Sequence, residues 1–141
     1  SSAASDVYKR QPDMRQYSDI ILYGDNTSPE TQKLLAEYLQ RHDSLKVQLS
    51  FFDNKNDSTC KDEQVIAYAE LQKALFFCKR KKIPLLFISI KDMISDIRFL
   101  NLLEESHIDF RCIDFPWFCK ENFPLIKAVV LYERLETGIN V

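Results

Sequence analysis

The sequence predicts an α/β protein, a three-layer sandwich in which helices cover both faces of a mostly parallel central sheet of four to five strands. Short apolar runs of strand length alternate with segments whose apolar residues recur at helical spacing. The run at residues 84–90 is almost entirely apolar, as is typical of a strand buried on both faces. The chain has 141 residues, 45% of them hydrophobic, which suffices for one core. Strand–helix–strand units then imply parallel pairing.

The first half of the chain contains two predicted strands separated by one helix. Residues 19–23 form a short apolar run and predict the first strand. A helix is expected to begin at residues 28–30, because Ser28 can cap it, Pro29 suits its first turn and Glu30 lies at the positive end of its dipole. The helix ends near His42, and the run KVQLSFF, Lys46–Phe52, supplies the second strand.

The second half continues the alternation after a polar, turn-rich segment, which predicts a surface loop. Helical spacing, apolar runs and helix-start signals define the elements that follow. In chain order they are the loop at 53–61, a helix over 62–82, a strand over 84–90, a helix over 96–105, a strand over 109–113 and a last helix from about Asn122, with Pro124 in its first turn.

Composition and charge restrict the domain organisation and the class of function. Residues 17–138 are expected to form one domain, preceded by a disordered or non-native leader at residues 1–16. The net charge of −2 argues against binding of nucleic acid over the whole surface. No apolar run approaches the roughly 20 residues of a membrane-spanning helix, so we expect a cytoplasmic protein without a membrane partner.

Nucleotide and metal sites are not predicted. The chain has 2 glycines, too few for a phosphate-binding P-loop or a dinucleotide fingerprint, so we expect no nucleotide and no cofactor. The cysteines include no C-x-x-C pair and are accompanied by only 2 histidines, so they do not predict a zinc site. We interpret them as reduced thiols in or near the core: Cys60, Cys78, Cys112 and Cys119.

Four aspartates follow the predicted strands: Asp25, Asp53, Asp92 and Asp114. Because the carboxyl ends of parallel strands meet at one edge of the sheet, we expect these aspartates to lie where α/β proteins place their functional sites. One interpretation is that they hydrogen-bond the backbone where loops begin. The other is a divalent-cation site, since hard cations prefer carboxylate ligands.

A basic run ends the predicted helix over 62–82 and consists of Lys79, Arg80, Lys81 and Lys82. Cations at this place complement the negative end of the helix dipole. The alternative is a patch that contacts DNA phosphates. Trp117 follows Pro116 in a loop and is expected to pack over the sheet edge, although in an exposed position it would form a docking patch.

Three segments carry a family resemblance. Residues 70–87 read ELQKALFFCKRKKIPLLF, residues 109–116 read DFRCIDFP and residues 128–134 read AVVLYER. They resemble the E-L-Q-K-A-L helix with its basic turn and central strand, the next strand with its D-x-P turn, and the A-A-V-A-E-H-E-R stretch of the long helix in serine recombinases of the resolvase/invertase family. Before Glu70 the resemblance is looser and rests on Tyr23, on SPETQ at residues 28–32 and on the second strand.

The resemblance implies the resolvase catalytic-domain fold and a role in DNA recombination. In that family a serine attacks a DNA phosphodiester and becomes joined to the 5′ phosphate, while several arginines stabilise the charge that develops. No metal or nucleotide is needed. The physical logic is a nucleophile inside a preorganised cationic cage, and arginine suits the cage because its planar fork matches a phosphate.

The positions that match the family's active site carry other residues. In the segment that matches Y-x-R-x-S-T, Asp25 stands in place of the arginine and Thr27 in place of the nucleophilic serine. The remaining substituted positions are Lys91 for the aspartate and Asp92 and Ser95 for the arginines of L-D-R-L-x-R, and Tyr68 for the arginine of R-P-E-L.

These substitutions imply a recombinase-family domain that no longer cleaves DNA. An arginine replaced by aspartate repels a phosphate, and one charge pair amounts to roughly 4 kcal/mol at about 4 Å and an effective dielectric of about 20. Arg98 or Arg111 would restore a cage if it closed around Thr27. The alternatives are an active recombinase with an atypical cage and a stand-alone interaction or regulatory module, such as a homodimer. We expect weak DNA binding, since no helix-turn-helix region follows the long helix in this chain.

Overall fold

The computed structural model of the chain describes residues 18–25, 27–53 and 68–136. Four strands form one sheet in the order β2-β1-β3-β4, and each neighbouring pair is parallel. Their bounds are Asp19–Gly24 for β1, Lys46–Phe52 for β2, Leu85–Phe87 for β3 and Phe110–Cys112 for β4. The predicted α/β class and parallel sheet are therefore confirmed, with four strands in the described part of the chain.

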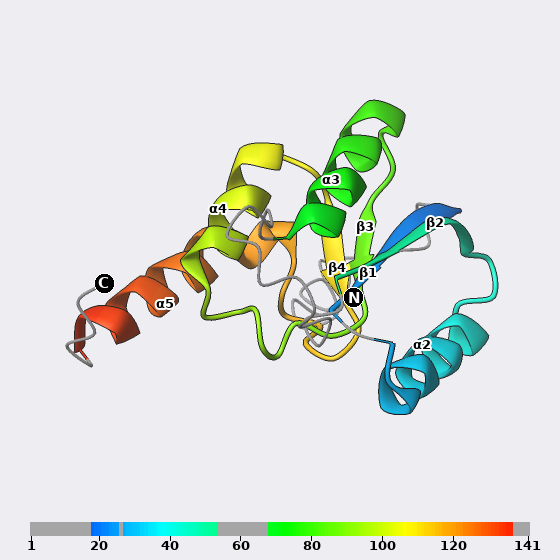
Figure 1. The fold of residues 1–141 in the computed structure, drawn as a ribbon, viewed down its shortest axis with the longest axis horizontal. Coiled ribbons are helices and arrows are strands. Elements are labelled where there is room, and N and C mark those ends of the chain that lie inside the picture. Colours follow the sequence, from blue (N-terminus) through cyan, green and yellow to red (C-terminus); the bar gives the residue numbers. More distant parts are fainter. Residues whose placement is uncertain (1–17, 26, 54–67, 137–141) are drawn as a thin grey trace, which may run out of the picture.

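Helices cover both faces of this sheet (Figure 1). On one face, α2 (Pro29–Arg41) packs against Ile20 and Leu22 of β1. The other face, which includes Ile21 and Tyr23, is covered by the remaining α-helices of the described chain. These are α3 (Ala69–Lys81), α4 (Ile97–Ser106) and α5 (Phe123–Glu136). Successive residues of β1 thus point to opposite faces, and the arrangement fits a three-layer α/β sandwich.

Phe87, on the central strand β3, ties the larger core together. Its ring makes edge-on contacts with other buried rings at centroid distances between 5.5 and 6.0 Å. Edge-to-face aromatic pairs stabilise a core by about 0.5–1.5 kcal/mol beyond the burial of their area. The partners come from β1, α4, β4 and the loop before α5: Tyr23, Phe99, Phe110 and Phe118.

The start of α2 agrees with the sequence, whereas that of α3 does not. Ser28 caps α2, because its Oγ accepts the backbone N–H of Thr31 at 3.3 Å. Tyr68 has a φ of 60°, in the left-handed region, so a helix cannot run through it and α3 begins at Ala69. Residues 62–67 of the predicted helix, the loop at 54–61 and the predicted leader lie outside the described residues.

Two strands are shorter than predicted. Leu85–Phe87 pair in the sheet, although Ile88 and Ile90 are also fully buried. The Ile88 N–H still donates to the Tyr23 carbonyl at 3.0 Å, after which the chain turns away. β4 is likewise limited to Phe110–Cys112. An apolar run in the sequence therefore indicates which residues are buried, but not how many of them pair with a neighbouring strand.

The last helix begins one residue later than predicted, after a short 3₁₀ turn, η2 (Lys120–Asn122). The loop before it contains Trp117, which is 48% exposed, and Phe118, which is fully buried. Cys78, Cys112 and Cys119 are buried free thiols, as predicted, whereas Cys60 lies outside the described residues. None of the described helices is long and apolar enough to cross a membrane.

Candidate functional site

The carboxyl edge of the sheet contains a phenol–carboxylate pair that joins a buried tyrosine to a partly exposed aspartate. Tyr23, near the end of β1, donates its hydroxyl to Asp53 Oδ2 at 2.7 Å. Asp53 follows β2 and also accepts the backbone N–H groups of Glu70 and Leu71 at 3.0 and 3.1 Å. These N–H groups belong to the first turn of α3, so Asp53 caps a helix that begins elsewhere in the chain. Burial and the hydrogen bond to Asp53 raise the pKa of Tyr23, which stays protonated.

A second pair lies between the starts of α3 and α4. Tyr68 donates its hydroxyl to Asp96 Oδ2 at 2.6 Å. Asp96 is the N-cap of α4, and its other oxygen accepts the Arg98 backbone N–H at 2.9 Å. The Arg98 guanidinium forms an ion pair with Asp96 at 3.1 Å and lies 6.0 Å from the centre of the Tyr68 ring. The side chain of Tyr68, which precedes α3, thus contacts the first residue before α4.

The pKa of Asp96 predicts an acid-sensitive contribution to stability. Burial by itself raises this pKa, but hydrogen bonds from Arg98 and Tyr68 outweigh it and lower the pKa from 3.8 to about 2. The contribution is therefore complete above 3.8 and is lost as the pH falls through about 2. Because Arg98 is exposed, solvent screens the pair, and we expect Asp96→Asn to cost about 1 kcal/mol at neutral pH. Urea unfolding of parent and variant should show this difference shrinking between those two pH values.

Asp114, after β4, closes the turn that follows β3. One of its oxygens accepts the Ser89 hydroxyl at 2.9 Å and the Ile90 backbone N–H at 3.2 Å. The other oxygen accepts from the Cys112 thiol at 2.6 Å. Asp53 and Asp114 thus hydrogen-bond backbone groups, but these groups lie 17 to 24 residues away along the chain and not in the loop that each aspartate begins. Within the described ranges, no group of three or more histidine, cysteine, aspartate or glutamate residues could hold a metal ion.

The positions that match the recombinase nucleophile and its first arginine lie close together but differ in exposure. Asp25 is 5% exposed and lies near enough to Tyr23 to raise the pKa of that phenol further. Thr27 is exposed. In the part of the chain that the structure describes, Thr27 makes no hydrogen bond to an arginine. Asn26, between them, lies outside the described residues.

The other matching positions lie in the segment from β3 to α4 and at the start of α3. Lys91, Asp92 and Ser95 are exposed in a compact turn, in which the Met93 and Ile94 N–H groups both donate to the Ile90 carbonyl. Tyr68 is buried with its hydroxyl on Asp96.

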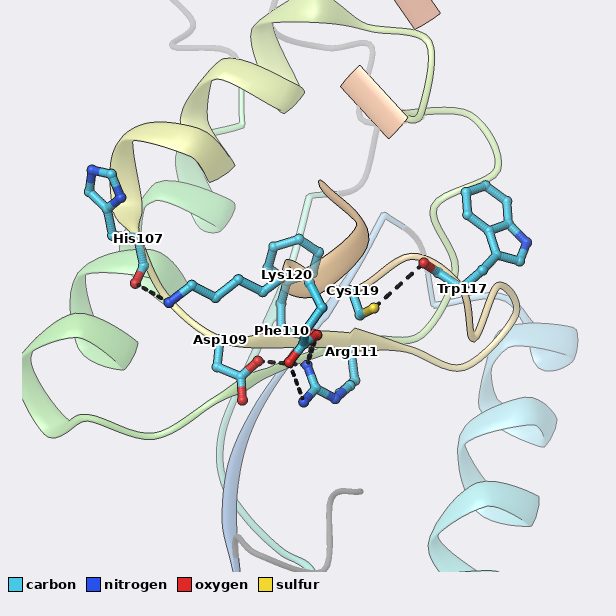
Figure 2. A network of polar contacts seen from close by, with 8 residues as sticks. His107, Asp109, Phe110, Arg111, Trp117, Cys119 and Lys120 are labelled. Atoms are coloured by element: carbon cyan, nitrogen blue, oxygen red, sulfur yellow. Dashed lines mark hydrogen bonds and ion pairs between the residues drawn. The ribbon is translucent and has the colours of Figure 1, made fainter. Parts of the chain in front are cut away.

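Neither Arg98 nor Arg111 completes a cage at Thr27. Arg98 is held by Asp96, as described above. Arg111, on β4, is 9% exposed, and its guanidinium contacts Asp109 at 2.6 Å and Glu121 at 3.3 Å (Figure 2). It also donates to the Phe110 carbonyl at 2.7 Å. Arg111 therefore ties β4 to η2, the turn that leads into α5.

The basic run lies at the opposite edge of the sheet. Lys79–Lys81 end α3 and Lys82 is its C-cap, all four of them exposed. α3 has 13 residues, so at 1.5 Å per residue about 20 Å separates this run from Tyr68 at the other end of the helix. A phosphate bound by these lysines would not lie at Thr27.

The carboxyl edge can therefore donate and accept hydrogen bonds, but its charge is mainly negative. The carboxylates of Asp25 and Asp53 lie near the Tyr23 hydroxyl, whereas Asp96 and Asp114 bind other groups, and the Arg98 guanidinium is paired with Asp96. The sequence placed three of these aspartates but missed the roles of Tyr68, Asp96 and Arg111. The N-cap pattern of Asp96 before an apolar helix could have been recognised, whereas the partners of Tyr68 and Arg111 depend on tertiary packing.

Comparisons of the chain with protein-family models, with curated proteins and with solved structures gave no match.

Proposed function

We propose that this chain is a domain of the serine-recombinase type that does not cleave DNA. The observation that carries the proposal is the buried carboxylate of Asp25, at the position that matches a phosphate-binding arginine. A carboxylate at that place repels the phosphate that Thr27 would have to attack. Its neighbour Asp53 adds a second negative charge that is fixed by three hydrogen bonds.

Within the described residues, no base or cation contacts the candidate nucleophile Thr27. A hydroxyl attacks a phosphate only when a base or a cationic environment lowers the barrier, and each 1.36 kcal/mol of barrier changes the rate tenfold. Thr27 is exposed, and both candidate arginines are engaged by other carboxylates. Replacing one attractive charge pair by a repulsive one costs roughly 4–8 kcal/mol before screening, so the expected rate of cleavage is negligible.

The test is the trapping of a covalent protein–DNA adduct. The protein and a Thr27→Ala/Ser28→Ala variant are incubated with supercoiled DNA, denatured and separated on a gel, with an active serine recombinase as positive control. We expect no adduct from either protein. An adduct formed by the parent and lost in the variant would show that Thr27 or Ser28 is a working nucleophile, and the proposal would be abandoned.

A specific surface favours a second function, that of a self-associating module. One stripe of α5 is apolar and exposed, while the opposite stripe, with Phe123, Ile126 and Val130, is buried in the core. The exposed stripe consists of Leu125 (69% exposed), Val129, Tyr132 and Leu135 (79% exposed). We call these four residues the α5 stripe.

The spacing of the α5 stripe suits helix pairing. Its members lie four, three and three residues apart, close to the spacing with which two helices pack along an apolar seam. The second half of α5 extends away from the sheet and from the other helices (Figure 1), which leaves room for a second copy. We therefore propose that the domain, although it does not cleave DNA, forms a homodimer through the α5 stripe.

Charge substitution on the α5 stripe is expected to abolish this dimer. Val129→Glu places a carboxylate in the seam while keeping a good helix former. Sedimentation equilibrium over a range of protein concentrations should report a dimer for the parent and a monomer for the variant. Phe76→Glu is the matched control, because Phe76 is an exposed apolar residue on a different helix. A parent that remains monomeric at all concentrations would contradict the dimer.

A further inference from the structure

A cavity lies at the amino edge of the sheet, opposite the site described above. It has a volume of about 270 Å³. It is open to solvent on one side and is lined by the ends of α3 and α4 and by the chain that leads from them into β3 and β4. Its lining is mostly apolar and includes Cys78, Ile83, Pro84 and Ile108. Small-molecule sites in proteins are apolar cavities of about 300–1,000 Å³ with a few polar groups, so this cavity suits a compact ligand.

Polar and charged residues also line the cavity. Lys79 and Lys82 line it and are exposed, and neither forms an ion pair with another described residue. Asp109 also lines it, but its carboxylate is paired with Arg111 at 2.6 Å. Lys120 lies alongside, since its ammonium group donates to the carbonyl of the lining residue His107 at 3.3 Å (Figure 2).

The net charge around the cavity is therefore positive. The ends of α3 and α4 each contribute about half a negative charge from their terminal carbonyls. The ammonium groups of Lys79, Lys82 and Lys120 exceed this, even though Arg111 offsets only one of the two carboxylates that it contacts, those of Asp109 and Glu121. A cationic ligand would be repelled here, and a small polar anion would leave the apolar lining unfilled.

We propose that this cavity binds a small amphipathic carboxylate, with its apolar chain against Ile83, Pro84 and Ile108 and its carboxylate between Lys79 and Lys82. Burial of the chain supplies most of the affinity. The lysines select the sign of the charge. The ligand site is independent of the recombinase-type function, because the two lie at opposite edges of the sheet.

Calorimetric titration with octanoate tests the proposal. Octanoate should bind, whereas acetate, which lacks the apolar chain, and octylamine, which carries the opposite charge, should not. Lys79→Gln/Lys82→Gln should weaken octanoate binding about fivefold, as expected for the loss of two partly exposed ion pairs. Lys33→Gln/Lys46→Gln removes the same charge from exposed positions away from the cavity and should leave binding unchanged.

Chemical-shift mapping locates the bound octanoate independently of any variant. Amide signals of Ile83, Ile108 and Asp109 should move on titration, and those of the α5 stripe should not. The proposal is overturned if octanoate fails to bind, if octylamine binds equally well, if the Lys79/Lys82 variant binds like the parent, or if the shifts map to the α5 stripe. None of these outcomes depends on DNA cleavage.

Discussion

Asp53→Ala is expected to lower the free energy of unfolding by about 3 kcal/mol. The substitution removes the acceptor of three hydrogen bonds, from the Tyr23 hydroxyl and from the Glu70 and Leu71 N–H groups. Tyr23 is fully buried beside the partly exposed Asp53, so its hydroxyl would lose the acceptor to which it donates. Urea unfolding followed by circular dichroism measures the difference.

Two further variants separate the contributions. Tyr23→Phe removes the phenol hydroxyl but leaves Asp53 to cap α3, and should cost about 1 kcal/mol. Asp92→Ala is the matched control, because Asp92 also follows a strand but is exposed and makes no side-chain hydrogen bond to another described residue. It should change stability by less than about 0.5 kcal/mol.

The sign of the Asp53 result also bears on function. Carboxylates kept for catalysis are often held under mutual repulsion, so that their removal stabilises the protein at the expense of activity. The removal of a carboxylate that is kept for structure destabilises the protein instead. If Asp53→Ala were as stable as the parent or more stable, Asp53 would belong to a functional cluster, and the interpretation of the carboxyl edge as a structural one would be wrong.

The sequence predicted the layout of the fold because its signals are local. The α2 start at Ser28–Pro29 and the strand Lys46–Phe52 agree with the structure, since caps and apolar runs depend on neighbouring residues alone. The length of β3 could not be predicted, because β4 offers only three partners to it. The break at Tyr68 was also hidden, since no glycine or asparagine marks its left-handed backbone.

The candidate site was predictable in position but not in detail. Parallel strands bring their carboxyl ends together whatever the side chains are, so Asp25, Asp53 and Asp114 could be placed at one edge. Their partners could not be predicted: Asp53 and Glu70 are 17 residues apart, and Asp114 reaches back 24 residues to Ile90. The pairing of Arg111 with Asp109 could have been predicted, because residues two apart in a strand lie on the same face of the sheet.

Arg111→Ala is expected to destabilise the protein by about 3 kcal/mol, because breaking a buried ion pair leaves the remaining charge without compensation. Arg111 is held by Asp109, Glu121 and the Phe110 carbonyl, and the Asp109 carboxylate is itself only 21% exposed. Arg98→Ala is the matched control, since Arg98 is 69% exposed and its ion pair should contribute less than about 1 kcal/mol. Thermal and urea unfolding of both variants provide the comparison.

Arg111→Ala also tests how α5 is positioned. Arg111 joins β4 to η2, and η2 leads directly into α5. Its loss should therefore reduce the order of the helix that carries the α5 stripe, and so weaken the dimer as well as the fold. The double variant Arg111→Met/Asp109→Val removes both charges and should recover part of the stability. The reason is that an apolar pair replaces a cation whose Nε is buried without a hydrogen-bond partner in the described chain. This double variant should not regain full dimerisation, because the contact between residue 111 and Glu121 is still missing. If it were less stable than Arg111→Ala, the buried charge on Asp109 would not be the cause of the loss.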